Sequence, residues 1–129
     1  MANTPKDLRY TAEHEYVKQT GDTAVVVVGI TDYAQGELGD VVYVDLPKAG
    51  AVFTRMQVFG TIEAVKAVSE LFCPVAGTVV EANAALEKDP AAVNRDPYGA
   101  GWMIKLRIQN ATEVGQLMDA AAYAKKIGQ

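Results

Sequence analysis

The sequence predicts one mainly β domain that carries short helices and ends in a helix. β-branched residues dominate its first two thirds, which is the composition that half-buried strands favour. At 129 residues, half of them apolar, the chain has the size of one compact domain with its own core. In the last segment, apolar residues fall near one helical face: Val114, Leu117, Met118, Ala121, Ala124 and Ile127. We therefore expect residues 1–129 to form a single domain.

The expected strands are separated by turn residues. Residues 15–19 and 23–29 form two strands joined across Gly21-Asp22, which is a strong hairpin signal. The turn residues of 47–50 separate two further apolar segments. Further strands are expected at 41–46, 52–53, 58–65, 68–73, 77–82 and 101–108.

Three features locate the helices. The Thr31 hydroxyl can cap a short helix at 32–35, which the region of Gly36 and Gly39 then stops. The pairs Asp89-Pro90 and Asp96-Pro97 oppose a long helix in that region. Thr112 can cap a C-terminal helix over about 112–126, and we expect its apolar face to pack against the sheet.

Composition excludes several classes of function. A formal net charge of −4 and a pI near 4.9 argue against nucleic acid as a partner, although basic protein surfaces remain suitable partners. The longest purely apolar stretch, 24–30, is far shorter than the roughly 20 residues that span a bilayer. The first residues lack a signal-peptide pattern, so we expect no membrane association and a cytoplasmic location.

The scarcity of cysteine and histidine limits metal and disulfide chemistry. Cys73 is the only cysteine, so no internal disulfide can form, and His14 is the only histidine. A zinc site with the usual ligands is hard to build from this set, and we expect no metal. We expect His14 to make a structural hydrogen bond, Cys73 to be a packed residue, and Trp102 and Met103 to fill the core.

One lysine stands out by its position in the strand pattern. Lys66 lies between the strand segments 58–65 and 68–73. At a hairpin tip its amine projects away from the sheet, while the paired strands hold its backbone still for a modifying enzyme. An exposed turn lysine is by itself usually only a solvated charge, so a functional assignment needs further support.

Sequence motifs around Lys66 supply that support. Glu63-Ala-Val-Lys66-Ala, followed by Pro74-Val-Ala-Gly77, resembles the lipoylation hairpin of lipoyl domains, and biotinyl domains share a similar layout. Outer motifs resemble the glycine cleavage H-protein family in order and spacing, from Tyr10 to Tyr123. They are His14-Glu-Tyr-Val17, 28–35, 38–47, Val93-Asn94, Asp96-Pro-Tyr-Gly99 and Gly101-Trp102. Tyr16, Ala64 and Glu70 depart from the residues common in that family, namely tryptophan, serine and aspartate.

The resemblance implies a barrel-sandwich hybrid of the lipoyl and biotinyl (hammerhead) type, and a non-catalytic carrier with lipoate attached covalently to Lys66. Such a carrier passes an aminomethyl group from glycine decarboxylase (P protein) to aminomethyltransferase (T protein). Dihydrolipoyl dehydrogenase (L protein) reoxidises the arm, and lipoylating enzymes attach it. By the same resemblance, Glu15 and Glu70 are candidates for contacting the aminomethyl nitrogen in a cleft that shelters the arm.

Other functions compete with this one. A biotinyl carrier typically has methionine on both sides of its lysine, so Val65 and Ala67 count against it. A lipoyl relay that serves other complexes, or an unmodified binding domain, is compatible with the sequence. An independent enzyme ranks last, because no nucleophile, base and orienting group can be assembled from these residues.

Overall fold

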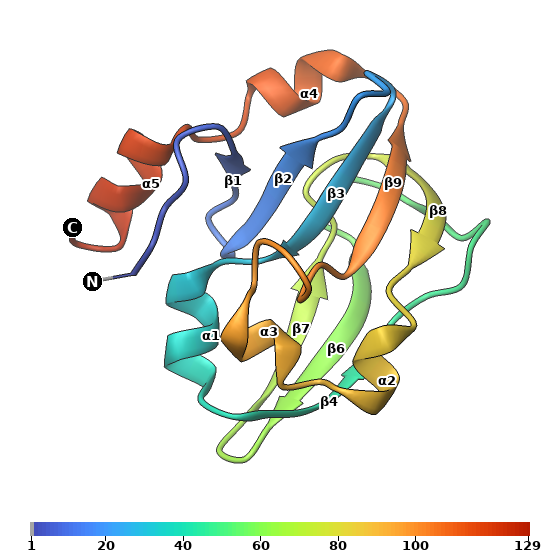
Figure 1. The fold of residues 1–129 in the computed structure, drawn as a ribbon. Helices are drawn as coiled ribbons and strands as arrows, with labels where there is room; N and C mark the ends of the chain where they lie inside the picture. Colours follow the sequence, from blue (N-terminus) through green and yellow to red (C-terminus); the bar gives the residue numbers. More distant parts are fainter. Residues whose placement is uncertain (1) are drawn as a thin grey trace.

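The computed structural model describes residues 2–129, which form nine strands and five short helices (Figure 1). The strands are β1 (Arg9–Tyr10), β2 (Glu15–Gln19), β3 (Val25–Ile30), β4 (Val41–Asp45), β5 (Val52–Phe53), β6 (Val58–Ala64), β7 (Val68–Phe72), β8 (Gly77–Ala82) and β9 (Ile104–Ile108). The helices are α1 (Asp32–Leu38), α2 (Ala85–Lys88), α3 (Ala92–Arg95), α4 (Ala111–Gly115) and α5 (Ala120–Lys126). The mainly β class expected from the sequence is confirmed.

The strands form two antiparallel sheets. The larger has the order β1-β2-β3-β9-β8-β5 and the smaller the order β4-β6-β7. Their inner faces share one apolar core, in which Val28, Ile62 and Leu106 are fully buried. Burying an aliphatic side chain of this kind contributes roughly 1.5–3 kcal/mol. This core is the base on which the β6–β7 hairpin stands.

The first predicted hairpin is confirmed, with a longer turn than expected. β2 pairs with β3 in the register Glu15↔Ile30 to Gln19↔Val26. The Asp22 carboxylate accepts the Ala24 N–H at 2.9 Å, so the turn extends past Thr23 and β3 begins at Val25.

A second cluster of buried residues closes one edge of the larger sheet. It consists of Leu8, Tyr10, Tyr16, Ala120 and Tyr123. The rings of Tyr10 and Tyr123 stack with centroids 4.6 Å apart, so α5 lies beside β1 (Figure 1). The ends of the chain meet here, because the Ala2 N–H donates to the Gln129 side-chain oxygen at 2.7 Å.

The helix predicted after Thr31 is present, and the two Asp-Pro pairs follow short helices, as expected. The Thr31 hydroxyl accepts the Ala34 N–H and caps α1. α1 continues through Gly36 to Leu38, and its C-cap is Gly39, whose φ of 79° favours glycine. α2 and α3 have four residues each, and their C-caps are Asp89 and Asp96, the residues that precede the prolines.

The segment predicted as one helix over about 112–126 is divided into α4 and α5. Between them Met118 pairs with Tyr10, through N–H···O contacts of 2.8 and 3.0 Å, and a helix cannot continue through that bridge. Asp119 then caps α5 by accepting the Ala122 N–H. The cap of α4 is Asn110, two residues before the predicted cap Thr112.

Other corrections are local. β9 begins at Ile104 instead of residue 101, because the Gly101 and Trp102 N–H groups donate to the carbonyls of Asp96 and Gly99 in a turn and not to a neighbouring strand. Met103 is fully buried as predicted, but Trp102 is only partly buried, with the Lys105 amine 5.2 Å from its ring centroid. None of the helices in residues 2–129 is both long and apolar enough to cross a membrane.

Candidate functional site

Lys66 lies at the exposed tip of the hairpin formed by β6 and β7. The pairing runs from Val58↔Phe72 to Glu63↔Val68, and the Ala64 N–H donates to the Ala67 carbonyl at 2.7 Å to close the turn. Figure 1 shows this turn projecting past the start of β4. The tip is thus presented to solvent by a paired, two-stranded support.

A second contact fixes the tip to the neighbouring strand. The Val65 N–H donates to the Asp40 carbonyl at 3.0 Å, just before β4 begins. Val65 and Val68 on either side of Lys66 are 71% and 68% exposed. The backbone of the tip is therefore held while the Lys66 side chain remains accessible.

Gly60 allows β4 and β6 to approach each other beneath the tip. A Cβ at this position would collide with the Asp45 carbonyl oxygen, so a side chain there would push the two strands apart. The sheet register also shifts between Val58 and Gly60. The close packing of β4 on β6 is thus a property of the sequence and supports the hairpin.

An acidic cleft of about 280 Å³ lies beside β7. It is bounded by residues at the start of β2, by α1 and by β7. Its lining contains four glutamates and no lysine or arginine: Glu13, His14, Glu15, Ile30, Tyr33, Ala34, Glu37, Leu38, Ile62, Ser69, Glu70 and Leu71. The charge of the lining suits a cationic group.

Glu15 is the buried carboxyl group of this cleft. It is 1% exposed, and its carboxyl oxygens accept the Thr11 hydroxyl at 2.8 Å and the Phe72 N–H at 3.4 Å. Burial raises the pKa of Glu15 to about 8, against the opposing effect of those two hydrogen bonds. The Glu15 carboxyl group is therefore mostly protonated at neutral pH.

Glu70 is exposed on β7, across the hairpin from Thr61. The structure thus brings Glu15 and Glu70 into one lining, although they are far apart in the sequence. Lys66 is not part of that lining and lies at the tip from which β7 starts. Sequence reasoning missed Glu37 and Tyr33 as lining residues, since the predicted helix ended before Glu37 and the i, i+4 spacing of the two was not visible.

His14 and Cys73 have the structural roles expected of them. His14 Nδ1 lies 2.7 Å from the Tyr123 hydroxyl oxygen. Cys73 is fully buried and donates its S–H to the Val75 carbonyl at 3.2 Å. Burial raises the pKa of the Cys73 thiol to about 12, so this thiol is no nucleophile at neutral pH.

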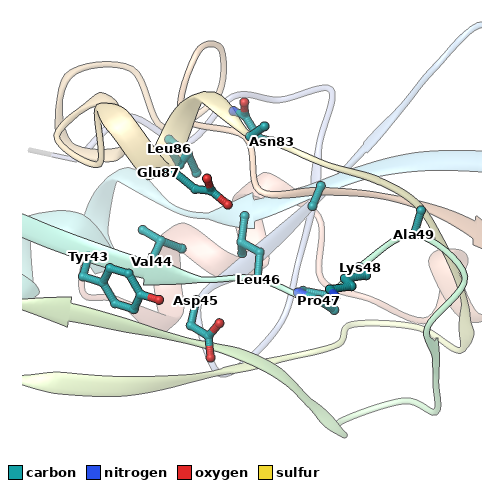
Figure 2. A pocket seen from close by; sticks show the side chains of 12 residues that line it. Tyr43, Val44, Asp45, Leu46, Pro47, Lys48, Ala49, Asn83, Leu86 and Glu87 are labelled. Atoms are coloured by element: carbon teal, nitrogen blue, oxygen red, sulfur yellow. The ribbon is translucent and has the colours of Figure 1, made fainter.

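A second hollow, of about 570 Å³, lies between the end of β4 and α2. Figure 2 shows Tyr43, Asp45 and Glu87 around it. Asn83 in its lining is satisfied by the carbonyls of Ala100 and Trp102. None of the residues that sequence analysis singled out as a site lines this hollow.

Comparisons with known proteins identify the family. The family model for the glycine cleavage H-protein matches residues 8–129. A glycine cleavage system H protein of Chlorobium phaeovibrioides is 52% identical over 98% of both chains, and one of Bacteroides fragilis is 54% identical over 94% of both. A crystal structure of a glycine cleavage system H protein from Mycobacterium marinum matches with a TM-score of 0.88 and 40% identity, covering 97% of this chain and 99% of that one.

These matches confirm the expected barrel-sandwich fold of the lipoyl type. They extend over nearly the whole chain, as the sequence motifs suggested. The chain belongs to the glycine cleavage H-protein family, and it is a non-catalytic, lipoyl-carrying shuttle protein of the glycine cleavage system.

Proposed function

We propose that Lys66 is the residue that carries the lipoyl group, and that the loaded arm folds back into the cleft lined by Glu15 and Glu70. The single observation that carries this proposal is the placement of an accessible primary amine on a rigid hairpin next to an acidic cleft. Lys66 is exposed in the turn, whereas the backbone N–H groups of Ala64 and Val65 donate to the carbonyls of Ala67 and Asp40.

The attachment is an acyl transfer to the Lys66 amine. An activated lipoyl ester or thioester, supplied by a lipoylating enzyme, gives its acyl group to Nζ. A new amide bond forms, and the leaving group departs with the proton that the amine loses. The acylated side chain loses its charge and becomes a longer, mobile tether.

The hairpin length brings the cleft within reach of such a tether. Glu70 lies four residues beyond Lys66, so their backbones are at most about 13 Å apart at the rise of an extended strand. A lysine stem extended by a lipoyl chain can cover that span. When bound, the dithiolane supplies the thiol–disulfide chemistry and the sulfur that holds the aminomethyl group.

The glutamates then have distinct tasks. Glu15 lies inside the cleft, where an ammonium at the arm's end would favour its ionised form and receive a charge-assisted hydrogen bond. Exposed Glu70 lies at the open side of the same lining and can accept a second hydrogen bond. Release of the arm requires breaking these contacts, which gives partner enzymes a point of control.

This protein works with the other components of the glycine cleavage system. We infer that its partners are glycine decarboxylase, aminomethyltransferase, dihydrolipoyl dehydrogenase and the lipoylating enzymes. The local concentration of a tethered arm favours successive reactions with enzymes that visit one tip. The cytoplasmic location expected from the sequence stays a prediction.

The test is intact-mass and peptide mass spectrometry of protein from its native cells, with fragmentation across residues 60–77. We expect a lipoyl group on Lys66, its loss in Lys66→Arg and its retention in Lys18→Arg, where the exposed lysine lies on β2. Biotin on Lys66 would move the assignment to a carboxylase carrier. An unmodified lysine in lipoate-replete cells would reject the proposal, and lipoyl transfer to other complexes would establish the relay role.

A further inference from the structure

A chain of side-chain hydrogen bonds connects helix α5 to the acidic cleft. The Tyr123 hydroxyl oxygen lies 2.7 Å from His14 Nδ1 and 2.7 Å from Thr31 Oγ1. Tyr123 and Thr31 are fully buried, whereas His14 is partly exposed in the lining of the cleft. The ring of His14 also meets the rings of Tyr123 and Tyr33, at centroid distances of 5.7 and 5.1 Å.

Counting donors and acceptors shows which group donates in each of these hydrogen bonds. Thr31 Oγ1 already accepts the Ala34 N–H, at 3.2 Å. Its own proton needs an acceptor, because Thr31 is buried, and the Tyr123 oxygen is the acceptor at hydrogen-bond distance. Tyr123 therefore donates its proton to His14 Nδ1, which leaves the His14 proton on Nε2.

The backbone of His14 is held on both sides. Its N–H donates to the Thr11 carbonyl at 3.1 Å, and its carbonyl accepts the Thr31 N–H at 3.0 Å. Its φ of 74° lies in the left-handed region, which few residues other than glycine adopt. The imidazole is thus attached to a fixed segment next to Glu15.

His14 is also the residue of the cleft lining that could add a positive charge. The charged and titratable groups that face it are Glu13 beside it, Tyr33 and Glu37 on α1, and Tyr123 and Lys126 on α5. Burial and then Lys126 lower the pKa of His14, and the two glutamates oppose this only in part. Electrostatics and hydrogen bonding thus favour the same neutral ring.

We propose that Tyr123 is a positioning residue for the arm cleft, and that it holds His14 as a neutral imidazole with its proton on Nε2. A protonated His14 would compete with an ammonium at the arm's end for Glu15 and Glu70. The neutral ring keeps the four glutamates available to a cationic arm. This last consequence rests on the function proposed above, whereas the tautomer does not.

The tautomer can be measured on the unlipoylated protein, because His14 is the only histidine. In ¹⁵N-detected NMR of the imidazole we expect Nδ1 unprotonated and Nε2 protonated at neutral pH. Tyr123→Phe keeps the ring that stacks on Tyr10 but removes the donor. In this variant we expect mixed tautomers and a titration midpoint of His14 raised by about half to one pH unit.

Tyr33→Phe is the matched control, because it removes the hydroxyl of another ring that lies against His14, whereas the hydrogen bond to His14 Nδ1 comes from Tyr123. It should retain the Nε2–H tautomer. An Nδ1–H tautomer in the wild-type protein would overturn the proposal without any variant. The same spectrum in Tyr123→Phe as in the wild type would overturn it as well.

The effect on the arm is tested on the lipoylated protein loaded with the aminomethyl group. Water breaks the carbon–sulfur bond and releases ammonia and formaldehyde, leaving the thiol, and the rate of this loss is measured from pH 5.5 to 8. We expect Tyr123→Phe to lose the group several-fold faster at the acid end and to approach the wild-type rate at pH 8. Superimposable profiles would overturn the role in the cleft. Failure of the Lys66 assignment would appear separately, as absence of lipoyl on Lys66, and would leave the NMR result intact.

Discussion

The ring of Tyr16 fills the space beside Gly29, its partner across the β2–β3 ladder. A Cβ at Gly29 would lie 2.7 Å from the Tyr16 hydroxyl oxygen and 2.8 Å from two ring carbons. Tyr16 is buried and donates its hydroxyl proton to the Pro97 carbonyl at 2.6 Å, so the ring is fixed from its far end. Glycine at position 29 is thus needed for tyrosine at position 16.

We therefore expect Gly29→Ala to lower the free energy of unfolding by about 1–3 kcal/mol, as overpacking in a filled core does. Equilibrium urea unfolding measures it. Gly36→Ala is the control, because Gly36 lies in α1 with open space around its Cβ direction. Alanine there should raise stability by up to about 1 kcal/mol. Equal stability of Gly29→Ala and the wild type would contradict the packing of Tyr16.

The N-cap of α4 gives a second test. Asn110 accepts the Thr112 N–H at 3.0 Å with its side-chain oxygen, whereas the Thr112 hydroxyl donates to that same oxygen. Asn110→Ala should cost about 1 kcal/mol of stability, the usual loss for an N-cap. Thr112→Ala should lower stability clearly less. Thermal unfolding of the two variants under the same conditions measures both losses. The reverse ranking would restore Thr112 as the cap.

Local chemistry explains which helix signals were predictable. Thr31 was identified as a cap because its hydroxyl bonds to the Ala34 N–H only three residues away. At the C-terminus the apolar periodicity continued through Met118, yet the backbone there pairs with Tyr10 from the far end of the chain. Such a pairing leaves no trace in periodicity, so one helix was predicted where two form.

In the candidate site, too, local features could be predicted and long-range contacts could not. The position of Lys66 between two strands was visible in the strand pattern and in the motifs around it. The burial of Glu15 was not, because its hydrogen-bond partner Phe72 lies 57 residues further along the chain. Likewise the contact of Tyr123 with His14 joins residues 109 positions apart. Contacts of this length depend on the tertiary fold and cannot be predicted from residue spacing.

The buried Glu15 carboxyl makes stability depend on pH. Its pKa is raised to about 8 in the folded protein, from an ordinary value of 4.5. Between these values the folded protein holds a proton that the unfolded chain has released. The contribution of Glu15 to the free energy of unfolding should therefore be complete below about pH 4.5 and be lost as the pH rises to about 8.

Glu15→Gln removes this titration and keeps an oxygen that can accept the Thr11 hydroxyl. We expect the variant to be more stable than the wild type at pH 8, by on the order of a few kcal/mol, and nearly equal at pH 5. Urea unfolding at several pH values measures the difference. A difference between the two proteins that does not change from pH 5 to 8 would contradict the buried, protonated carboxyl.

Lys66→Ala separates stability from function. The side chain is exposed at the hairpin tip, so we expect the free energy of unfolding to change by no more than about 0.5 kcal/mol. Transfer of the aminomethyl group should be abolished, since no other residue supplies an amine on that tip. The assay couples glycine decarboxylation to formation of the one-carbon product. Lys18→Ala, which removes an exposed lysine from β2, should transfer at the wild-type rate. Retained transfer in Lys66→Ala would reject Lys66 as the attachment site.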